Sequence, residues 1–590
     1  MEKTSFGRSL VRERDIRQLR AAQTTFESLS ITEKAIFLLL AAVLVGATLS
    51  LVGKASAEYS VSVPHKGGEL IEGIVGTPRF INPLLAVSDA DRDLTALVYS
   101  GLLKTRPGGG FSLDLAESYN ISPDGLEYSF TIKEGAVFHD GKPVTADDVV
   151  FTVTKAQDPA LKSPRRVSWE GVTVEKTGSR SVTFVLKQPY APFIANLTTG
   201  ILPKHIWSGL ESDPFIFSKK NIEAIGSGPY KISSIVRSDE GIPTEVVLRA
   251  NPDYALGEPN ISLLRLKFFA NEPALAAAVE NGAVESASNL SPASANEIEG
   301  MRTILRAPLT RVFGIFFNQN ENDILTSKDV RRALSLSIDR NDIIESVLFG
   351  YGTAADGPLP PTVAEAALRI SGTSTAPGDI AAASAILEKA KWRKSPEGVY
   401  ELRERTGSTT LSLSLSTANV PELVESARRI EEDWNALGAQ VDVRVFEPTD
   451  LNQGVIRPRK YDALLFGIVT GKNADLYPFW HSSQRNDPGL NISMYTNAKA
   501  DRALERMRTA TSTAGAAAEY MKLKAEIDAD VPAIFLWSPD FIYVAPKKLR
   551  GVIFDEITTP SDRFIGIEDW YVETDQVWKI FVGEKDEIIN

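Results

Sequence analysis

The chain contains no cysteine and only four histidines among its 590 residues. The missing cysteines exclude disulfide bonds, thiol catalysis, thiolate zinc sites and a cysteine-linked lipid anchor. The histidines lie far apart, at His65, His139, His205 and His481, and match no metal-binding spacing, so we expect no metal. The sequence also lacks a GxSxG motif and a glycine-rich phosphate loop. We therefore predict a protein that is not an enzyme and carries no cofactor.

Acidic residues outnumber basic residues in this chain. The chain has 64 Lys and Arg against 76 Asp and Glu, a net charge of −12, whereas phosphate contacts need concentrated Lys and Arg. We therefore exclude nucleic acid as a partner. A length of 590 residues exceeds what one hydrophobic core serves, which predicts two or three packing units.

Long apolar runs are also absent, except for residues 35–53, AIFLLLAAVLVGATLSLVG. This run is uncharged and close to the roughly 20 residues that span a bilayer. The preceding residues 1–34 carry seven Lys and Arg, so the positive-inside rule places them in the cytoplasm and everything after Lys54 outside. We expect a single-pass membrane anchor at 35–53, a linker at 54–67, and a working domain in the periplasm or at the cell surface.

Two alternatives for this run remain open. The first is a buried core helix. The second is a signal peptide cleaved after Ala57, because Ala55-Ser56-Ala57 has the small-x-small form that signal peptidase reads. The 34-residue leader is longer than a usual basic n-region, and a chain without cysteine has no lipid anchor to replace the helix. We favour the uncleaved anchor.

The residue pattern of the exported part predicts a mixed α/β fold. Leu411, Leu413 and Leu415 alternate as in a strand, a helical pattern follows over 421–437, and Val441, Val443 and Val445 alternate again. This order predicts a βαβ unit with parallel strands. Thr145 to Asp148 reads as a capping box, and Ser327 begins another helix.

Six stretches, in order, resemble the peptide/nickel/opine class of extracytoplasmic solute-binding proteins, bacterial family 5. The most specific is 115–152, with its PDG turn, YSFTIK strand and FHDGKPVTADDV segment. The others are GSGPYK at 226–231, LRANPDY at 248–254, DVRRALSLSIDR at 329–340, GYGTAADGPLPP at 350–361, and 461–484 with YDALLFG and YPFWHSSQ.

The resemblance implies a two-lobed clamp of the periplasmic-binding-protein type II class, with an extra inserted subdomain. Lobe I would comprise residues 68–94, 206–312 and 544–590, the inserted subdomain 95–205, and lobe II 313–543. The chain would cross between lobes near Val312–Phe317 and near Phe541–Ala545. Only the α/β character follows from the residue pattern itself.

The resemblance also implies a function. The protein would capture peptides or similar small solutes by closing its lobes, and would deliver them to an ABC permease in the membrane. We expect a monomeric ectodomain. The alternative is a membrane-tethered ligand sensor or a chaperone-like peptide-binding protein.

The resemblance places ligand contacts in loops that border the cleft. These candidates are Asp475, Tyr477, Trp480, His481, Phe80, Asn82, Phe317, Asn318 and Lys472. In peptide-binding relatives an aspartate in the loop after the YDA strand holds the ligand's amino group. Asp475 sits later than that position, which falls nearer Gly471 or Lys472, so recognition of a free amino terminus is in doubt and Lys472 suits an anionic group.

The residues themselves leave structural roles open. Asp475 is equally an aspartate that forms a turn or caps a helix. Trp480 suits a cleft or a core, because aromatic side chains serve both. Phe317 fits packing in a crossing strand, and His481 fits a helix cap.

Overall fold

The computed structural model describes residues 24–578, except 108, 371–377, 405–406, 473 and 511. Residues 1–23 of the predicted cytoplasmic leader therefore lie outside the described residues. The described chain divides into two compact units. One unit comprises the residues up to His65 together with those from Thr574, and the other comprises Lys66–Glu573.

The smaller unit contains one long helix and a two-stranded sheet. Helix α2 (Ile31–Tyr59) includes a segment, Ile31–Leu51, of mean hydropathy 2.2, which is long and apolar enough to cross a membrane. Strand β1 (Ser60–His65) pairs with β23 (Glu573–Trp578), and His65 Nδ1 lies 2.7 Å from Asp575 Oδ2. Most of the expected linker 54–67 is thus the end of α2 and a paired strand.

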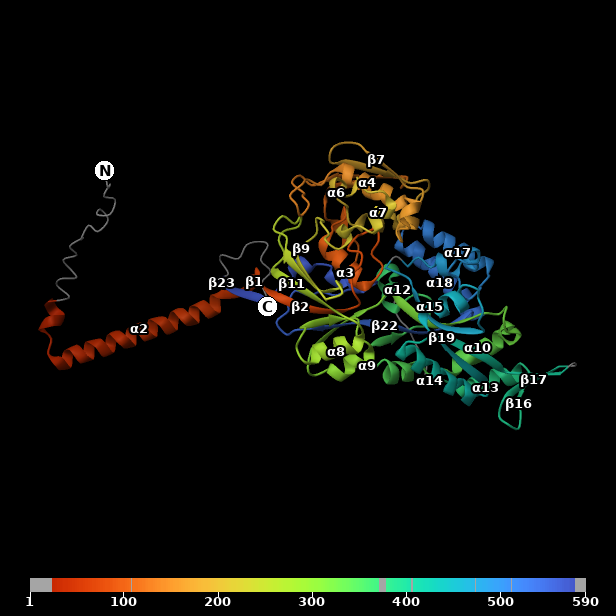
Figure 1. Ribbon diagram of the computed structural model, residues 1–590. Coiled ribbons are helices and arrows are strands. Elements are labelled where there is room, and N and C mark those ends of the chain that lie inside the picture. The colour runs from red at the N-terminus through yellow and green to blue at the C-terminus, as the bar shows by residue number, and fades with distance from the viewer. Residues whose placement is uncertain are drawn as a thin grey trace. The chain divides into compact units, whose positions relative to one another are not determined.

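The larger unit is built on one mixed sheet (Figure 1). Its strands follow the order β20-β19-β21-β14-β22-β12-β2-β11-β10-β9, while β13 and β15 also pair with β22. Their bounds are β2 Gly67–Val75, β9 Tyr230–Arg237, β10 Pro243–Ala250, β11 Ile261–Phe269, β12 Ser286–Ser288, β13 Thr303–Pro308, β14 Arg311–Phe317, β15 Gly352–Ala354, β19 Ser412–Ala418, β20 Gln440–Phe446, β21 Ala463–Val469 and β22 Ala533–Ala545.

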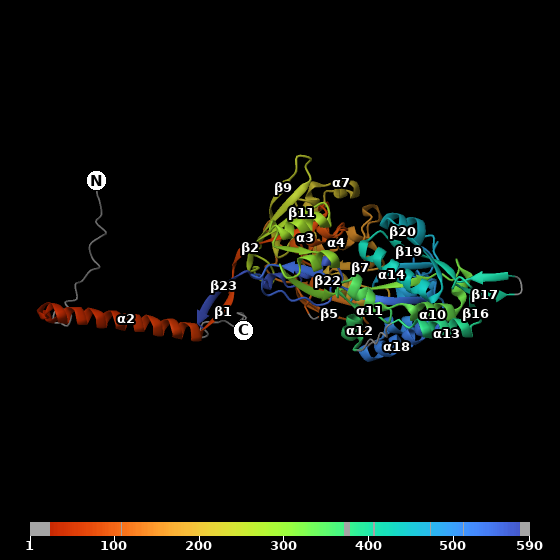
Figure 2. The same ribbon diagram turned by 90° about the horizontal axis from the view of Figure 1, so that it is seen from below.

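The two largest of four hydrophobic clusters among the described residues divide this sheet into lobes. Apolar residues from Val312 to Trp537 form the lobe II core, and those from Leu70 to Ala307 and from Phe541 to Trp570 form the lobe I core. Strand β22 serves both, and Figure 2 shows it between β9 and β11 of lobe I and β19 and β20 of lobe II. The mixed α/β, two-lobed fold predicted from the sequence is confirmed.

The chain changes lobe a few residues away from the predicted crossings. Val312–Phe317 already belong to β14 and the lobe II core, so the first change falls between Ala307 and Val312. Phe541–Ala545 already belong to lobe I, so the second change falls between Trp537 and Phe541. Both predicted stretches are buried strands, but each packs within one lobe.

The βαβ unit of lobe II is confirmed. Strands β19 and β20 pair in parallel, with α14 (Pro421–Leu437) between them in the chain. Gly438 ends this helix with a φ of 111°, a conformation that favours glycine. The other main helices of lobe II are α10 Lys328–Ser337, α12 Pro361–Leu368, α13 Ile380–Lys389, α16 Tyr477–Trp480, α17 Ala498–Thr509 and α18 Thr513–Asp530.

Residues 95–205, predicted as an inserted subdomain, form a second sheet. Its antiparallel order is β5-β6-β8-β7. The predicted capping box begins α4, where Asp148 accepts the Thr145 backbone N–H at 2.9 Å. The elements here and at the lobe I boundary are α3 Asp89–Val98, β3 Leu103–Thr105, β4 Phe111–Leu113, β5 Ala116–Ile121, β6 Glu127–Ile132, α4 Ala146–Gln157, β7 Thr173–Lys176, β8 Ser181–Val185, η2 Ala191–Thr198, α6 Lys204–Trp207 and α7 Ser212–Ile216.

Candidate ligand-binding site

An ion pair stands at the end of lobe II strand β21. Asp475 lies in the loop between β21 and α16, where its Oδ1 accepts the backbone N–H of Tyr477 at 3.2 Å. Arg508, in the last turn of α17, donates to Oδ1 at 3.0 Å and to Oδ2 at 2.7 Å. This two-point geometry is the strong form of an Arg–carboxylate contact. Asp475 therefore accepts the first backbone N–H of α16 and already has a cationic partner within its own lobe.

Flat side chains stack beside this pair. The Arg508 guanidinium lies 4.2 Å from the centre of the Tyr477 ring. Tyr477 in turn stacks on His481, with ring centres 4.1 Å apart and an interplanar angle of 16°. His481 Nδ1 lies 2.8 Å from Ser483 Oγ, so the imidazole is held in place. The structure thus brings together three predicted residues, Asp475, Tyr477 and His481, around Arg508.

Tyr190, in the inserted subdomain, lies within electrostatic range of the same pair. It is the residue before η2, and its side chain remains 38% exposed. Burial raises the pKa of the Tyr190 phenol, the Asp475 carboxylate raises it further, and Arg508 opposes them. Tyr190 of the inserted subdomain and the Asp475–Arg508 pair of lobe II are therefore close enough to interact electrostatically.

A second pair of charged groups includes Lys472. Glu556, in the segment that follows β22 back to lobe I, is 6% exposed, and its Oε1 has no hydrogen-bond partner among the residues described. Burial raises the pKa of the Glu556 carboxyl, Asp555 adds to the rise, and Lys472 lowers it. The Glu556 carboxylate and a lysine from the other lobe therefore lie within electrostatic range of one another.

The remaining predicted residues are mostly interior. Asn82 is fully buried and donates to Asn221 Oδ1 at 2.9 Å, while Asn318 donates to the Arg459 carbonyl at 2.7 Å. Phe317 and Trp480 belong to the lobe II core. Phe80 is half-buried beside the lobe I core. The structure does not gather these five around Asp475, and a role in ligand binding stays a prediction.

Sequence reasoning missed Arg508, Tyr190 and Glu556. Arg508 is one of several basic residues on an exposed helix, 33 positions after Asp475. No local pattern distinguishes it from a solvated charge. Tyr190 follows a strand in a proline-containing turn, QPYAP, which signals a loop but not what the loop faces. Arg508 and Tyr190 come near Asp475 only through the packing of the lobes, which the local sequence does not show.

Two lobes that share a mixed sheet, with polar and aromatic side chains facing each other across their junction, define the class of hinged solute-binding proteins. The chain belongs to one family of this class, the bacterial extracellular solute-binding proteins, family 5, whose sequence model matches residues 110–488.

The comparisons extend over most of the chain. The chain is 28% identical over 556 residues to the oligopeptide-binding protein AppA of Bacillus subtilis. This alignment covers 91% of this chain and 97% of that protein. The solved structure of that AppA in complex with a nonapeptide matches with a TM-score of 0.67, covering 86% of this chain and all of that one. The crystal structure of NikZ of Campylobacter jejuni in complex with Ni(L-His) matches at 26% identity and a TM-score of 0.68. This match covers 85% of this chain and 99% of that one.

Proposed function

We propose that this protein captures peptides or similar small solutes between its two lobes and delivers them to an ABC permease. Membership of family 5 and the full-length similarity to an oligopeptide-binding protein support this function. The lobes are joined at two places in the chain, which suits a hinged closure that buries a ligand. The protein supplies binding and no chemistry.

The observation that carries the proposal is the meeting of Asp475, Arg508 and Tyr477 of lobe II with Tyr190 of the inserted subdomain. An extended peptide presents backbone donors and acceptors that need partners once they are buried. A carboxylate and a guanidinium side by side offer an acceptor and donors within one cluster. Two tyrosines supply rigid contact area with a polar end.

The paired state of Asp475 affects which peptide end is bound. Arg508 and the Tyr477 backbone N–H already use both carboxylate oxygens, so a ligand ammonium has to share them. Arg508 is one-third exposed and can offer further donors to a ligand carboxylate or carbonyl. We therefore propose that Asp475 orients Arg508 and Tyr477 toward the ligand, with Lys472 as a second cation.

The location is also part of the proposal. The segment Ile31–Leu51 anchors the protein in the cell membrane, and the larger unit works outside the cytoplasm as a monomer. Cleavage after Ala57 would release that unit instead. We keep residues 95–205 for the inserted subdomain, and lobe II becomes residues 312–537, with the crossings moved as described.

The test is thermal unfolding of the full chain in detergent, with and without a pool of di- to octapeptides. A ligand that binds only the folded state at a hundred times its Kd adds about 2.7 kcal/mol to the free energy of unfolding, which raises the midpoint. Protein that was unfolded, washed and refolded serves as the control for ligand carried through purification. No shift with this material would contradict peptide capture.

A further inference from the structure

Arg311 lies in the segment that joins the two lobes. The chain changes lobe just before β14, and Arg311 is the first residue of that strand. The preceding residue, Thr310, is hydrogen-bonded to both lobes. Its carbonyl accepts the backbone N–H of Thr470 of lobe II at 3.0 Å, and its own N–H donates to the carbonyl of Ile557 of lobe I at 2.9 Å. The backbone of Arg311 is therefore held at the junction of the lobes.

The side chain of Arg311 lies on a part of the sheet that solvent reaches. Arg311 pairs with Val469 of β21, and residues directly opposite each other in an antiparallel pair share one face of the sheet. Val469 is 40% exposed, and Arg311 is half-buried. From Val469 the chain continues into the loop that carries Lys472 and Asp475. Arg311 therefore lies beside the candidate ligand-binding site.

The Arg311 guanidinium has no ion pair or hydrogen bond with any residue in the described part of the chain. Burial lowers its pKa, and Asp89 at the start of α3 in lobe I opposes that effect. Asp89 already has partners in its own lobe, because Oδ1 lies 3.7 Å from Arg92 and Oδ2 accepts the Asn289 amide at 2.9 Å. A partly desolvated cation without a dedicated partner is costly to the fold.

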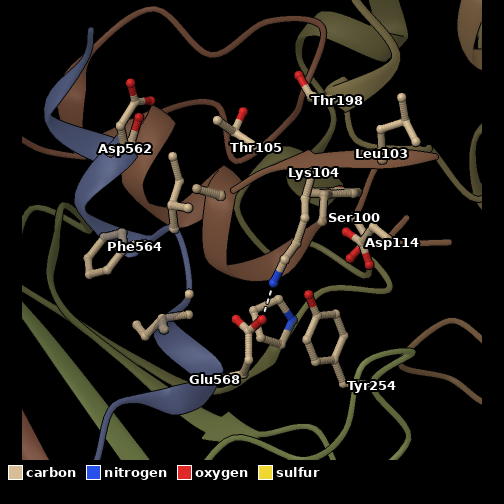
Figure 3. A pocket seen from close by; sticks show the side chains of 18 residues that line it. Ser100, Leu103, Lys104, Thr105, Asp114, Thr198, Tyr254, Asp562, Phe564 and Glu568 are labelled. Carbon is tan, nitrogen blue, oxygen red and sulfur yellow. Dashed lines mark hydrogen bonds and ion pairs between the residues drawn. The ribbon is translucent and has the colours of Figure 1, made fainter. Parts of the chain in front are cut away.

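The cation in the lobe I cavity is paired, in contrast to Arg311 (Figure 3). This cavity has a volume of about 180 Å³, and its walls include β3 and the turns η8 (Pro560–Phe564) and η9 (Ile567–Asp569). Lys104 on one wall forms an ion pair with Glu568 on another, as the dashed line in Figure 3 marks. Its lining residues thus present no unpaired cation to a ligand.

An unpaired guanidinium at the junction indicates the chemistry of the group that it binds. Its N–H donors form a planar fork that matches the two oxygens of a carboxylate, and such a contact strengthens where water is excluded. Arg508 already donates to Asp475 at 2.7 Å, whereas no described residue occupies the donors of Arg311. A ligand carboxylate would supply the partner that the protein itself does not provide.

We propose that Arg311 binds a carboxylate of the captured ligand, and that the protein thereby selects peptides or similar solutes that carry this group. The role of Arg311 rests on the proposed capture of peptides, to which it adds a residue that determines specificity. The carboxylate belongs either to an acidic side chain or to the C-terminus of the ligand. Both sources present the same two oxygens to the guanidinium.

The test compares three peptide pools on the full chain in detergent, after it has been unfolded, washed and refolded. The first pool contains di- to octapeptides of Ala, Leu and Glu, the second replaces every Glu by Gln, and the third is the second with amidated C-termini. The measurement is the peptide concentration that gives half the maximal rise of the unfolding midpoint. The third pool, which has no carboxylate, should need at least a ten-fold higher concentration than the first. If the second pool behaves like the third, the group is an acidic side chain, and if it behaves like the first, the group is the C-terminus.

Variants assign this selectivity to Arg311. Arg311→Gln should raise the half-maximal concentration of the first pool at least ten-fold and leave that of the third pool within two-fold. Arg311→Lys keeps the charge but not the planar fork, so its effect should lie between those of the parent and the Gln variant. Arg249→Gln is the matched control, because Arg249 is an exposed strand residue on β10 of lobe I, and it should change neither value. Without ligand, Arg311→Gln should unfold at the parent midpoint or above it, since it removes an unpaired charge.

Two results would overturn the proposal. No effect of Arg311→Gln, or an equal effect on all three pools, would refute the carboxylate contact and leave peptide capture intact. Failure of every pool to raise the midpoint of the refolded parent would refute peptide capture and the role of Arg311 together.

Discussion

The guanidinium of Arg563 donates to both carboxylate oxygens of Asp93, at 2.8 Å and 2.6 Å, inside lobe I. Its Nε donates to Glu72 Oε1 at 2.7 Å, and the Tyr543 hydroxyl donates to Glu72 Oε2 at 2.9 Å. All four residues are buried. The network joins β2, α3, β22 and η8, four segments that are far apart in the chain. It fixes the returning C-terminal segment to the lobe.

The first prediction concerns this network. Arg563→Met should lower the free energy of unfolding by about 3–5 kcal/mol, because it leaves two carboxylates buried without their partner. Urea unfolding measures the change. Arg444→Ala is the matched control, since Arg444 pairs with Asp442 at a site where both side chains are more than half exposed, and it should cost about 1 kcal/mol or less. Equal effects of the two substitutions would contradict the role of the buried network.

The second prediction concerns the pair at the lobe junction. Asp475→Asn and Arg508→Gln should each weaken peptide binding at least ten-fold, because each removes a charge and the orientation of its partner. A double-mutant cycle on peptide affinity tests whether the pair acts as a unit. The double variant should then lose little more affinity than either single variant. Additive losses would show that the two side chains act separately.

The third prediction concerns pH. Since burial raises the pKa of Asp114 to about 7, the folded chain holds this proton more tightly than the unfolded chain, in which an aspartate titrates near 3.9. The carboxyl therefore costs stability progressively as the pH rises from about 4 to about 7. Without added ligand, Asp114→Asn should gain stability relative to the parent chain over this range, as measured by urea midpoints. A stability difference that stays constant with pH would contradict the assignment.

The fourth prediction separates packing from binding at Trp480. This side chain is 1% exposed, and its ring centre lies 5.7 Å from that of Phe535. Trp480→Ala should cost about 3–5 kcal/mol in unfolding free energy, as large-to-small core substitutions do. Trp480→Phe should cost less and leave peptide affinity within two-fold of the parent. A ten-fold loss of peptide affinity in the stable Phe variant would instead support the predicted contact between Trp480 and the ligand.

The regular parts of this fold could be predicted from local pattern. The alternating leucines and valines around α14 and the glycine at its end specify strand, helix and strand without reference to the rest of the chain. The capping residues Thr145 and Ser327 act over three positions, which is also a local effect. Such elements are set by interactions that a short sequence window contains.

The site could be predicted only in part. Asp475, Tyr477 and His481 are close together in sequence, so one loop motif found all three. Arg508 and Tyr190 reach them through the packing of a helix and of an inserted subdomain, which no local window encodes. Asn82 and Asn318 read as loop polar residues that suit a ligand, but their amides are used to hold backbone and side chains inside the lobes.

Strand β22 gives the two lobes a common backbone. Its first half pairs with β14 and β15, its second half with β12 and β13, and Pro539 lies between the two halves. Proline supplies no N–H to a ladder, so β22 lacks one backbone donor at this residue. A rotation of one lobe against the other would twist this continuous strand near Pro539, which favours torsion over separation of the lobes. The amides of Ser538 and Asp540 should report that twist directly, through hydrogen-exchange rates that change when ligand binds.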